Sequence, residues 1–381
     1  MAFVAACGGG RDDTAAGSTQ LSAAARLGDK IFHDVTLSSS GRMACASCHQ
    51  ADAAHATGDP ALVVPPGGPA LATPGFRNSP SLRYLNASPA FFFDRKGTPT
   101  GGFNRDGRFD TLQAQSERAF LSAHEMDNGN AAAFVDKLQR ASYADEFRRV
   151  FGATIFDNAD AAFANARMAV QRFQQEDPRF QPFDSKYDQF LAGRVTLTER
   201  ELRGMALFND PAKGNCAGCH PSTRGANGAP PMFTDFSYDN LGVPRNPDIA
   251  ANADPGYYDL GLCGPFRSDL AGRADLCGAF KVPTLRNVAL SAPYFHNGRF
   301  KTLREVVAFY VRRDTHPEEF YPRNPDGTVN KFDDLPPQYR ANVNTAEVPY
   351  DRKPGQAPRL TDEEIDLVVA FMHTLTDGYP P

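Results

Sequence analysis

Two pentapeptides of one pattern constrain this chain more than any other feature. Residues 45–49 read CASCH and residues 216–220 read CAGCH, with starts 171 residues apart (216 − 45). C-x-x-C-H is the attachment signature of c-type haem, because both thiols add to the vinyl groups and the adjacent imidazole ligates the iron. A zinc site would need a further Cys or His pair beside each motif, and a redox pair would not need the trailing histidine twice. We therefore expect two covalently bound haem c groups. Their attachment and proximal residues would be Cys45, Cys48, His49, Cys216, Cys219 and His220.

Covalent haem attachment indicates the cellular compartment. In bacteria it takes place outside the cytoplasmic membrane, so we expect a periplasmic protein. That oxidising space also permits a disulfide. Cys263 and Cys277 enclose the loop GPFRSDLAGRADL and form the expected pair, with two buried free thiols as the alternative. No apolar stretch approaches the 18 or more residues typical of a membrane span.

The N-terminal residues and the charge balance restrict the partners. Residues 1–10 read MAFVAACGGG, which resembles the end of a bacterial lipoprotein signal with a lipidated Cys7. Only six residues precede this cysteine, without a basic region, so a tail with a free thiol is the alternative. The net charge is −5, and no run of Lys or Arg is present. We therefore expect no nucleic-acid partner and no membrane span, and we consider a lipid anchor at Cys7.

Helical patterns surround both motifs. Residues 21–32 carry an apolar stripe before the first motif, and capping boxes at Thr198 and Thr361 predict helices before the second motif and at the C-terminus. The 32 glycines and 30 prolines indicate long loops. Pro178 and Pro182 interrupt a helical pattern. We expect a mainly α fold with two cytochrome c-type domains, each holding one covalent haem. The expected division is a leader over 1–20 and domains over 21–185 and 186–381.

Two such motifs at this separation resemble the bacterial dihaem cytochrome c peroxidases and their MauG relatives. Further matching segments extend over residues 21–376 in the same order. These segments are RNSP at 77–80, RDGR at 105–108, LQAQ at 112–115, EM at 125–126, FTD at 233–235, LGVP at 241–244, FKVPTLRN at 280–287 and PYFHNG at 293–298. The resemblance implies that the N-terminal haem reacts with peroxide and that the C-terminal haem handles electrons.

The resemblance also implies a sixth ligand for the C-terminal haem. Peroxidases of the usual kind place a Met eight residues after a Thr that starts a helix, and here Tyr310 stands eight residues after Thr302. This is the MauG-type pattern. A phenolate is a hard anionic donor that stabilises ferric iron and lowers the reduction potential relative to a thioether. Core packing of Tyr310 is the alternative. The competing ligands are Met232, His296 and Met372, of which the resemblance places His296 near the haem propionates.

The usual peroxidases carry a distal histidine after the first motif. Between His49 and Arg77 the only histidine is His55, six residues after the proximal ligand. Because six residues reach round a porphyrin edge with difficulty, we expect His55 at the surface or behind the ligand. The first haem would then be five-coordinate and open to peroxide, without reductive activation.

Cleavage of the O–O bond requires a positioned acid/base beside the iron. The family supplies a Glu ten residues after a Gln, and Gln115 and Glu125 keep this spacing. The resemblance implies that Glu125 takes a proton from one peroxide oxygen and returns it to the other, while Gln115 orients the peroxide. A solvated surface carboxylate is the alternative for Glu125.

Two further family features bear on the space between the haems. The family usually has a Trp before Asp-Gly-Arg, but this chain contains no Trp and has Arg105 there. A guanidinium cannot be oxidised like an indole, so Phe103 or Tyr84 takes over or the haems share oxidising equivalents more slowly. The resemblance also implies a calcium ion between the domains. Its expected donors are the side chain of Asn78 and the backbone carbonyls of Ser291 and Pro293.

These observations lead us to expect a dihaem peroxidase that reduces hydrogen peroxide to water. Its electron donor would be a small protein of the cytochrome c or cupredoxin type. One alternative is a MauG-like oxidase that modifies a partner protein or an organic substrate. The other is an electron-transfer cytochrome with two six-coordinate haems, for which His55 would be the distal ligand of the first. The sequence is compatible with a monomer or a homodimer.

Overall fold

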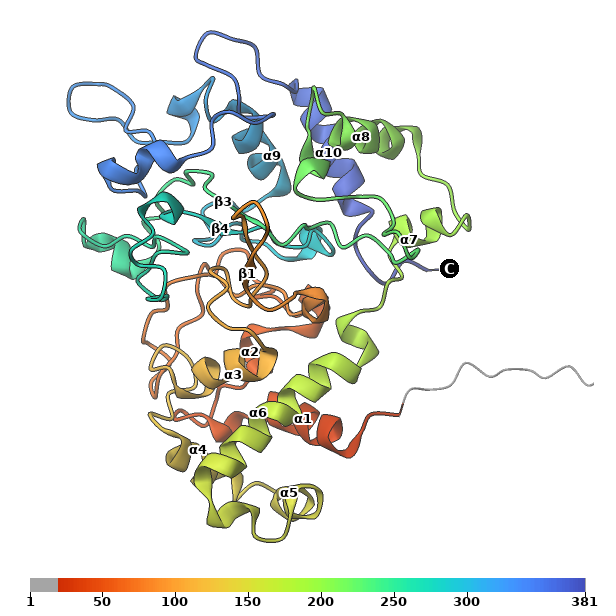
Figure 1. Cartoon of the computed structure of the whole chain (residues 1–381), viewed down its shortest axis with the longest axis vertical. Helices are drawn as coiled ribbons and strands as arrows, with labels where there is room; N and C mark the ends of the chain where they lie inside the picture. The colour runs from red at the N-terminus through yellow and green to blue at the C-terminus, as the bar shows by residue number, and fades with distance from the viewer. Residues whose placement is uncertain (1–19, 381) are drawn as a thin grey trace, which may run out of the picture.

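The computed structural model describes residues 20–380, in which α-helices predominate and sheet is limited to short paired segments (Figure 1). Cys7 therefore lies outside the described residues. The helices are α1 (Ala23–His33), α2 (Cys45–Cys48), α3 (Leu112–Leu121), α4 (Ala131–Leu138), α5 (Ala144–Phe151), α6 (Ala159–Glu176), α7 (Lys186–Leu191), α8 (Glu199–Asn209), α9 (Leu303–Arg312) and α10 (Asp362–His373). Two antiparallel pairs of strands accompany them: β1 (Phe92–Phe93) with β2 (Pro99–Thr100), and β3 (Tyr238–Asp239) with β4 (Phe280–Lys281).

The predicted helix starts are confirmed by their caps. The hydroxyl of Thr198 accepts a hydrogen bond from the Glu201 amide at the start of α8, and Thr361 caps α10 in the same way. Thr302 likewise starts α9. In each case the third residue of the helix returns a carboxylate to the cap, which satisfies amides that have no partner inside the helix.

The helix before each haem motif crosses a second helix at a glycine. On α1, a Cβ at Gly28 would lie 2.0 Å from the carbonyl oxygen of Ala169 on α6. On α8, a Cβ at Gly204 would lie 1.9 Å from the carbonyl oxygen of Leu367 on α10. Any side chain would push these backbones apart. The same close crossing thus supports both motifs.

The described residues form two hydrophobic clusters that share no member. One contains buried residues between 27 and 180, and the other contains buried residues between 187 and 375. Figure 1 shows the segment through α6 below and the segment from α7 to α10 above. Helix α6 ends at Glu176, and Pro178 begins the short turn that follows it. The first cluster ends at Phe180 and the second begins at Tyr187, so the boundary lies just after this turn.

Polar contacts connect the two halves. The Tyr84 hydroxyl donates to Asp377 over 2.6 Å, and the Arg77 guanidinium pairs with Asp259 at 2.5 Å. A bridge between Thr100 and Ser237 joins the two strand pairs. The loops between the halves are therefore held by hydrogen bonds and charge as well as by apolar packing.

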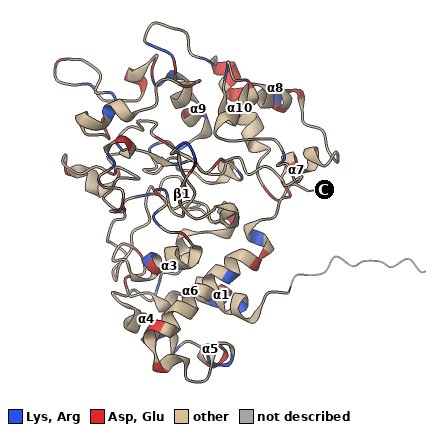
Figure 2. Cartoon of the chain, in the orientation of Figure 1, with Lys and Arg blue, Asp and Glu red and all other residues tan. Residues whose placement is uncertain are grey.

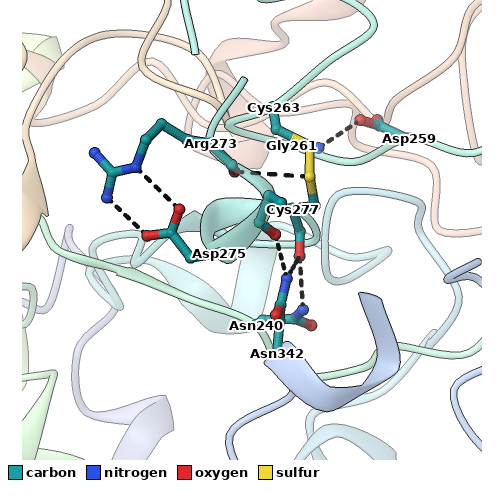
Figure 3. The surroundings of a disulfide bond; sticks show 9 residues. Asn240, Asp259, Gly261, Cys263, Arg273, Asp275, Cys277 and Asn342 are labelled. Atoms are coloured by element: carbon teal, nitrogen blue, oxygen red, sulfur yellow. Dashed lines mark hydrogen bonds and ion pairs between the residues drawn. A yellow bond between two sulfur atoms is a disulfide. The ribbon is translucent and has the colours of Figure 1, made fainter. Parts of the chain in front are cut away.

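The predicted disulfide between Cys263 and Cys277 is present (Figure 3). The Cys277 carbonyl accepts hydrogen bonds from the side-chain amides of Asn240 at 3.1 Å and Asn342 at 3.2 Å. The disulfide thus closes the Gly-rich loop and fixes it against two other segments.

Removal of this disulfide should lower stability without affecting haem attachment. For the Cys263→Ala/Cys277→Ala variant we expect the free energy of unfolding to fall by about 3 kcal/mol, because a loop of this length gains that much chain entropy in the unfolded state. Denaturant titration of oxidised and reduced wild-type protein beside the variant measures the effect. The reduced wild type should match the variant, whereas unchanged midpoints would contradict the prediction.

Charges of both signs are interspersed over the two halves (Figure 2). Acidic residues gather at the start of α10, where Asp362, Glu363 and Glu364 occupy the first turn. This placement is favourable at the positive end of a helix dipole. Among the helices of residues 20–380, none combines the length and apolar character needed to span a bilayer.

Candidate active site

One cavity of about 980 Å³ brings both C-x-x-C-H motifs together. Ligand sites in proteins typically have volumes of about 300–1,000 Å³, so this one lies at the upper end. Both motifs contribute to its wall. These residues are Cys45, Cys48, His49, Cys216, Cys219 and His220. The four thiols are free of disulfides, as thioether attachment requires.

The two motif histidines are oriented in the same way. Nδ1 of His49 lies 3.0 Å from the carbonyl oxygen of His55, and Nδ1 of His220 lies 2.7 Å from that of Phe233. Because a carbonyl only accepts, each Nδ1 carries the hydrogen and each Nε2 keeps its lone pair. Burial lowers the pKa of both imidazoles, which favours the neutral form that ligates metal. The donor set therefore fits two iron-bound haem groups.

Tyr310 lies on the cavity wall near the second motif. Its hydroxyl makes no hydrogen bond to residues 20–380, whereas the hydroxyl of neighbouring Tyr350 donates to Asp239 over 2.7 Å. Burial first, and then the charge of Asp239, raise the pKa of the Tyr310 phenol well above its ordinary value. Of these two tyrosines, Tyr310 is the one with a free oxygen for a metal. Among the competing ligands, Met232 does not line the cavity, but Met372 and His296 do.

His296 stands on the cavity wall between the halves. Its ring stacks on Phe280 with centroids 3.7 Å apart and planes 7° apart. Its Nε2 is buried and has no hydrogen-bond partner in the described part of the chain. Burial lowers the pKa of this imidazole to about 3, so the ring is neutral. The free nitrogen is available to a bound group.

Glu125 and Gln115 face the same cavity from the N-terminal half. Gln115 and Arg118 lie on one face of α3, and both line the cavity with Glu125. Nε of Arg118 lies 3.8 Å from Oε1 of Glu125. The Glu125 side chain is 43% exposed and lines the cavity. Desolvation by the surrounding protein raises the pKa of its carboxyl, while the charges of Arg118 and Arg108 oppose this rise. A carboxyl whose pKa is raised in this way is a better proton acceptor than an ordinary glutamate, as an acid/base group requires.

The two arginines beside Glu125 were not among the sequence-predicted residues. Arg118 stands three positions after Gln115, so helical periodicity alone puts both on one face of α3. Arg108 is the last residue of the RDGR segment and pairs with Asp106 at 2.7 Å. The spacing within α3 was therefore a usable signal for Arg118.

His55 takes the second of its two expected positions. Its side chain is 3% exposed, stacks on Phe180 at 4.3 Å and does not line the cavity. A surface position is therefore wrong. Its backbone carbonyl holds the proximal His49, so the residue supports the ligand through its main chain.

A variant at this position tests whether the His55 ring ligates iron. His55→Phe keeps the aromatic stack on Phe180 and the carbonyl that orients His49. We expect an unchanged electron paramagnetic resonance (EPR) signal for the N-terminal ferric haem. Conversion of that haem from low-spin to high-spin in the variant would identify His55 as its sixth ligand instead.

Arg105 also lies on the cavity wall. Its guanidinium donates through Nη2 to Oδ1 of Asn78, and its carbonyl oxygen accepts from the Lys281 amide at 2.9 Å. Burial and the charge of Arg77 lower the pKa of Arg105 to about 10. Burial and the charge of Arg105 lower the pKa of Lys281 to about 8. Phe103 and Tyr84 line the cavity as well.

The expected calcium donors line the cavity, and two of them, the Asn78 side chain and the Pro293 carbonyl, are engaged with the protein. Nδ2 of Asn78 donates to the Pro293 carbonyl, and Oδ1 of Asn78 accepts from Arg105. Calcium prefers six to eight oxygen ligands. The Arg105 guanidinium donates a hydrogen bond to the Asn78 oxygen that the ion would need, so this donor set does not fit calcium.

Comparison with known proteins agrees with this geometry. A family model described as di-haem cytochrome c peroxidase matches residues 22–196. The methylamine utilization protein MauG of Paracoccus denitrificans (strain Pd 1222) is 34% identical over 93% of this chain and 89% of its own. The cytochrome-c peroxidase IdrP1 of Pseudomonas sp. (strain SCT) is 30% identical over 75% of this chain and 71% of its own. The crystal structure of the diheme peroxidase BthA from Burkholderia thailandensis E264 aligns with a TM-score of 0.84 and 38% identity, covering 93% of this chain and 86% of that one.

Two observations lead to one assignment. One cavity contains both haem-attachment motifs, and the similarity to MauG extends along most of the chain. The similarity covers both halves, so it includes both motifs and the segments between them. The family implies two haem c groups and an oxidoreductase activity. The chain belongs to the family of dihaem cytochrome c peroxidases and MauG proteins.

Proposed function

We propose that this enzyme reduces hydrogen peroxide to water beside His49, using electrons that enter through the C-terminal half. The observation that carries the proposal is the position of Glu125 and Gln115, which face one cavity together with His49. A carboxyl with a raised pKa, a neutral amide and a proximal imidazole are the groups that peroxide cleavage needs.

The chemistry divides between the cofactor and the chain. A haem iron bound at His49 would supply the electrons that break the O–O bond. In the proposed reaction one H2O2, two electrons and two protons give two H2O. Glu125 takes the proton from one peroxide oxygen and delivers it to the other, and Gln115 orients the peroxide by hydrogen bonds. The charge of Arg118, 3.8 Å from Glu125, opposes the rise in the pKa of the carboxyl and so favours its base form.

We further propose that residues 21–185 and 186–381 form two cytochrome c-type domains with one haem each. The two separate hydrophobic clusters support this division. In the second domain, His220 and Tyr310 would both hold the haem iron, and the haem would then serve electron transfer. The free Tyr310 oxygen near the second motif supports this role. Calcium is not part of this proposal, because the Asn78 amide donates to the Pro293 carbonyl and accepts from Arg105.

The proposed partners follow from the reaction. The electrons come from a small donor protein of the cytochrome c or cupredoxin type in the periplasm. Cys7 would anchor the chain by lipidation, and the protein works as a monomer or a homodimer.

A MauG-like oxidase is the second candidate function. The relative from Paracoccus denitrificans is named a methylamine utilization protein, and the tyrosine at position 310 fits the MauG-type pattern. Such an enzyme would use the same peroxide chemistry to oxidise a partner protein.

Steady-state turnover separates the two functions. We expect rapid oxidation of a reduced small cytochrome c or cupredoxin by hydrogen peroxide, with two donor molecules oxidised per peroxide consumed. Peroxide consumption that no donor accelerates, together with oxidation of an added protein substrate, would favour the oxidase instead.

A further inference from the structure

Arg105 is a cation inside the cavity without a carboxylate partner. Within residues 20–380 no acidic side chain lies within 4.0 Å of its guanidinium. Its buried Nε has no hydrogen-bond partner there. Its one side-chain partner is the amide oxygen of Asn78. A buried guanidinium is stable only when an anion or several acceptors surround it, so this site requires a further negative group.

The neighbouring carboxylates are already occupied. Arg77 holds Asp259 through two nitrogens at 2.5 and 2.7 Å, and it holds Asp106 at 2.9 Å. Arg108 takes the same Asp106 oxygen at 2.7 Å. Within residues 20–380, Asp106 and Asp259 are thus committed to Arg77 and Arg108 rather than to Arg105.

Lys281 adds a second positive charge at the same place. Its Nζ donates to the Gly102 carbonyl at 2.5 Å and to the Ser88 hydroxyl at 3.3 Å, both of which are neutral. Its own backbone amide donates to the carbonyl oxygen of Arg105. Two cations therefore meet on one cavity wall, and the acidic group that acts on Lys281, Asp106, is already paired with Arg77 and Arg108. The propionate groups of haems held by the two motifs would supply carboxylates of the kind that such a wall binds.

The guanidinium also occupies the position that calcium would need. Oδ1 of Asn78 accepts from Arg105, and Nδ2 of the same amide donates to the Pro293 carbonyl. A divalent ion on these two oxygens would lie against the guanidinium. Like charges this close in a buried site repel strongly, so only one cation can stand there.

We propose that Arg105 is the built-in cation between the two halves, which takes the place of calcium and binds the haem propionates. The enzyme would then be independent of calcium. This inference concerns the space between the haems and not peroxide turnover, so its test is separable from the proposed function.

Metal analysis of the holoprotein is the first test. We expect less than stoichiometric calcium after purification, and ferric EPR spectra that change neither with the chelator EGTA nor with added CaCl2. One tightly held calcium per chain, whose removal by EGTA alters the EPR spectra, would overturn the proposal.

Substitution of Arg105 is the second test. Arg105→Gln keeps an N–H donor but removes the positive charge, and Arg105→Lys keeps the charge. A positive charge beside the haem edge favours the reduced state, so potentiometric titration should show lower haem potentials in Arg105→Gln and little change in Arg105→Lys. Added calcium should raise the potentials of Arg105→Gln only, because its Asn78 oxygen is free.

The exposed Arg95, from the same half of the chain, provides the control. Arg95→Gln should keep the wild-type potentials. Equal potentials for wild type and Arg105→Gln would overturn the proposal. If Arg105→Gln fails to fold, the calcium content of the wild-type protein still tests whether Arg105 takes the place of calcium.

Discussion

Replacement of Glu125 by Gln should lower kcat/KM for hydrogen peroxide by about 10²–10⁴-fold, the usual contribution of a positioned acid/base. The amide fills the same space beside Gln115 but cannot accept the proton that must leave the peroxide. Haem attachment and the ferric EPR spectra should remain those of the wild type, because neither motif is touched. The rate of reaction with peroxide, followed by stopped-flow absorbance, measures the loss.

A matched control is available on α3. Glu117 is half exposed and pairs with Arg167, and it does not line the cavity. Glu117→Gln should therefore react with peroxide at the wild-type rate. Equal losses in both variants, or a loss below tenfold at Glu125, would contradict the role of Glu125 as the base.

The pH dependence of the reaction with peroxide should also report the role of Glu125 as the base. Burial raises the pKa of Glu125, so its base form disappears at a higher pH than for an ordinary glutamate, whose pKa is about 4.3. The charges of Arg118, Arg108 and His124 limit this rise. Activity should increase as pH rises through the raised pKa and fall below it. This acidic limb should be absent in Glu125→Gln, and its persistence there would assign it to another group.

Replacement of Tyr310 by Met should produce the second large effect. A thioether stabilises ferrous iron relative to a phenolate, so the reduction potential of the C-terminal haem should rise by on the order of 100 mV or more. The low-spin ferric EPR signal should change its g values, while the signal of the N-terminal haem stays the same. Potentiometric titration with EPR detection measures both.

Tyr350 provides the control for this variant. It also lines the cavity and lies beside Tyr310 with ring centroids 6.3 Å apart, but its hydroxyl is committed to Asp239. Tyr350→Phe should keep the wild-type low-spin signal. If Tyr350→Phe changes the ligation and Tyr310→Met does not, the assignment of the ligand is wrong.

The sequence predicted those parts of the molecule that depend on local patterns. The capping boxes at Thr198, Thr302 and Thr361 lie where α8, α9 and α10 begin, because a cap needs only residues within one turn. The disulfide between Cys263 and Cys277 could be predicted because few other cysteines lie outside the two C-x-x-C-H motifs.

Contacts between residues far apart in the sequence could not be predicted in the same way. The contact of Arg105 with Asn78 joins residues 27 apart, and the contact of Asn78 with Pro293 joins residues 215 apart. Nothing in the local sequence indicates that a guanidinium would take the amide oxygen assigned to calcium. The buried stack of His55 on Phe180 likewise depends on how loops fold back over a distant segment. Such pairings are decided by tertiary packing, which sequence periodicity does not encode.

An EPR spectrum of the as-isolated ferric protein at neutral pH tests the central claim most directly. The account predicts one high-spin haem at His49, open to peroxide, and one low-spin haem ligated by His220 and Tyr310. Two low-spin haems would contradict it, because a distal ligand such as His124 on the cavity wall would then close the peroxide site.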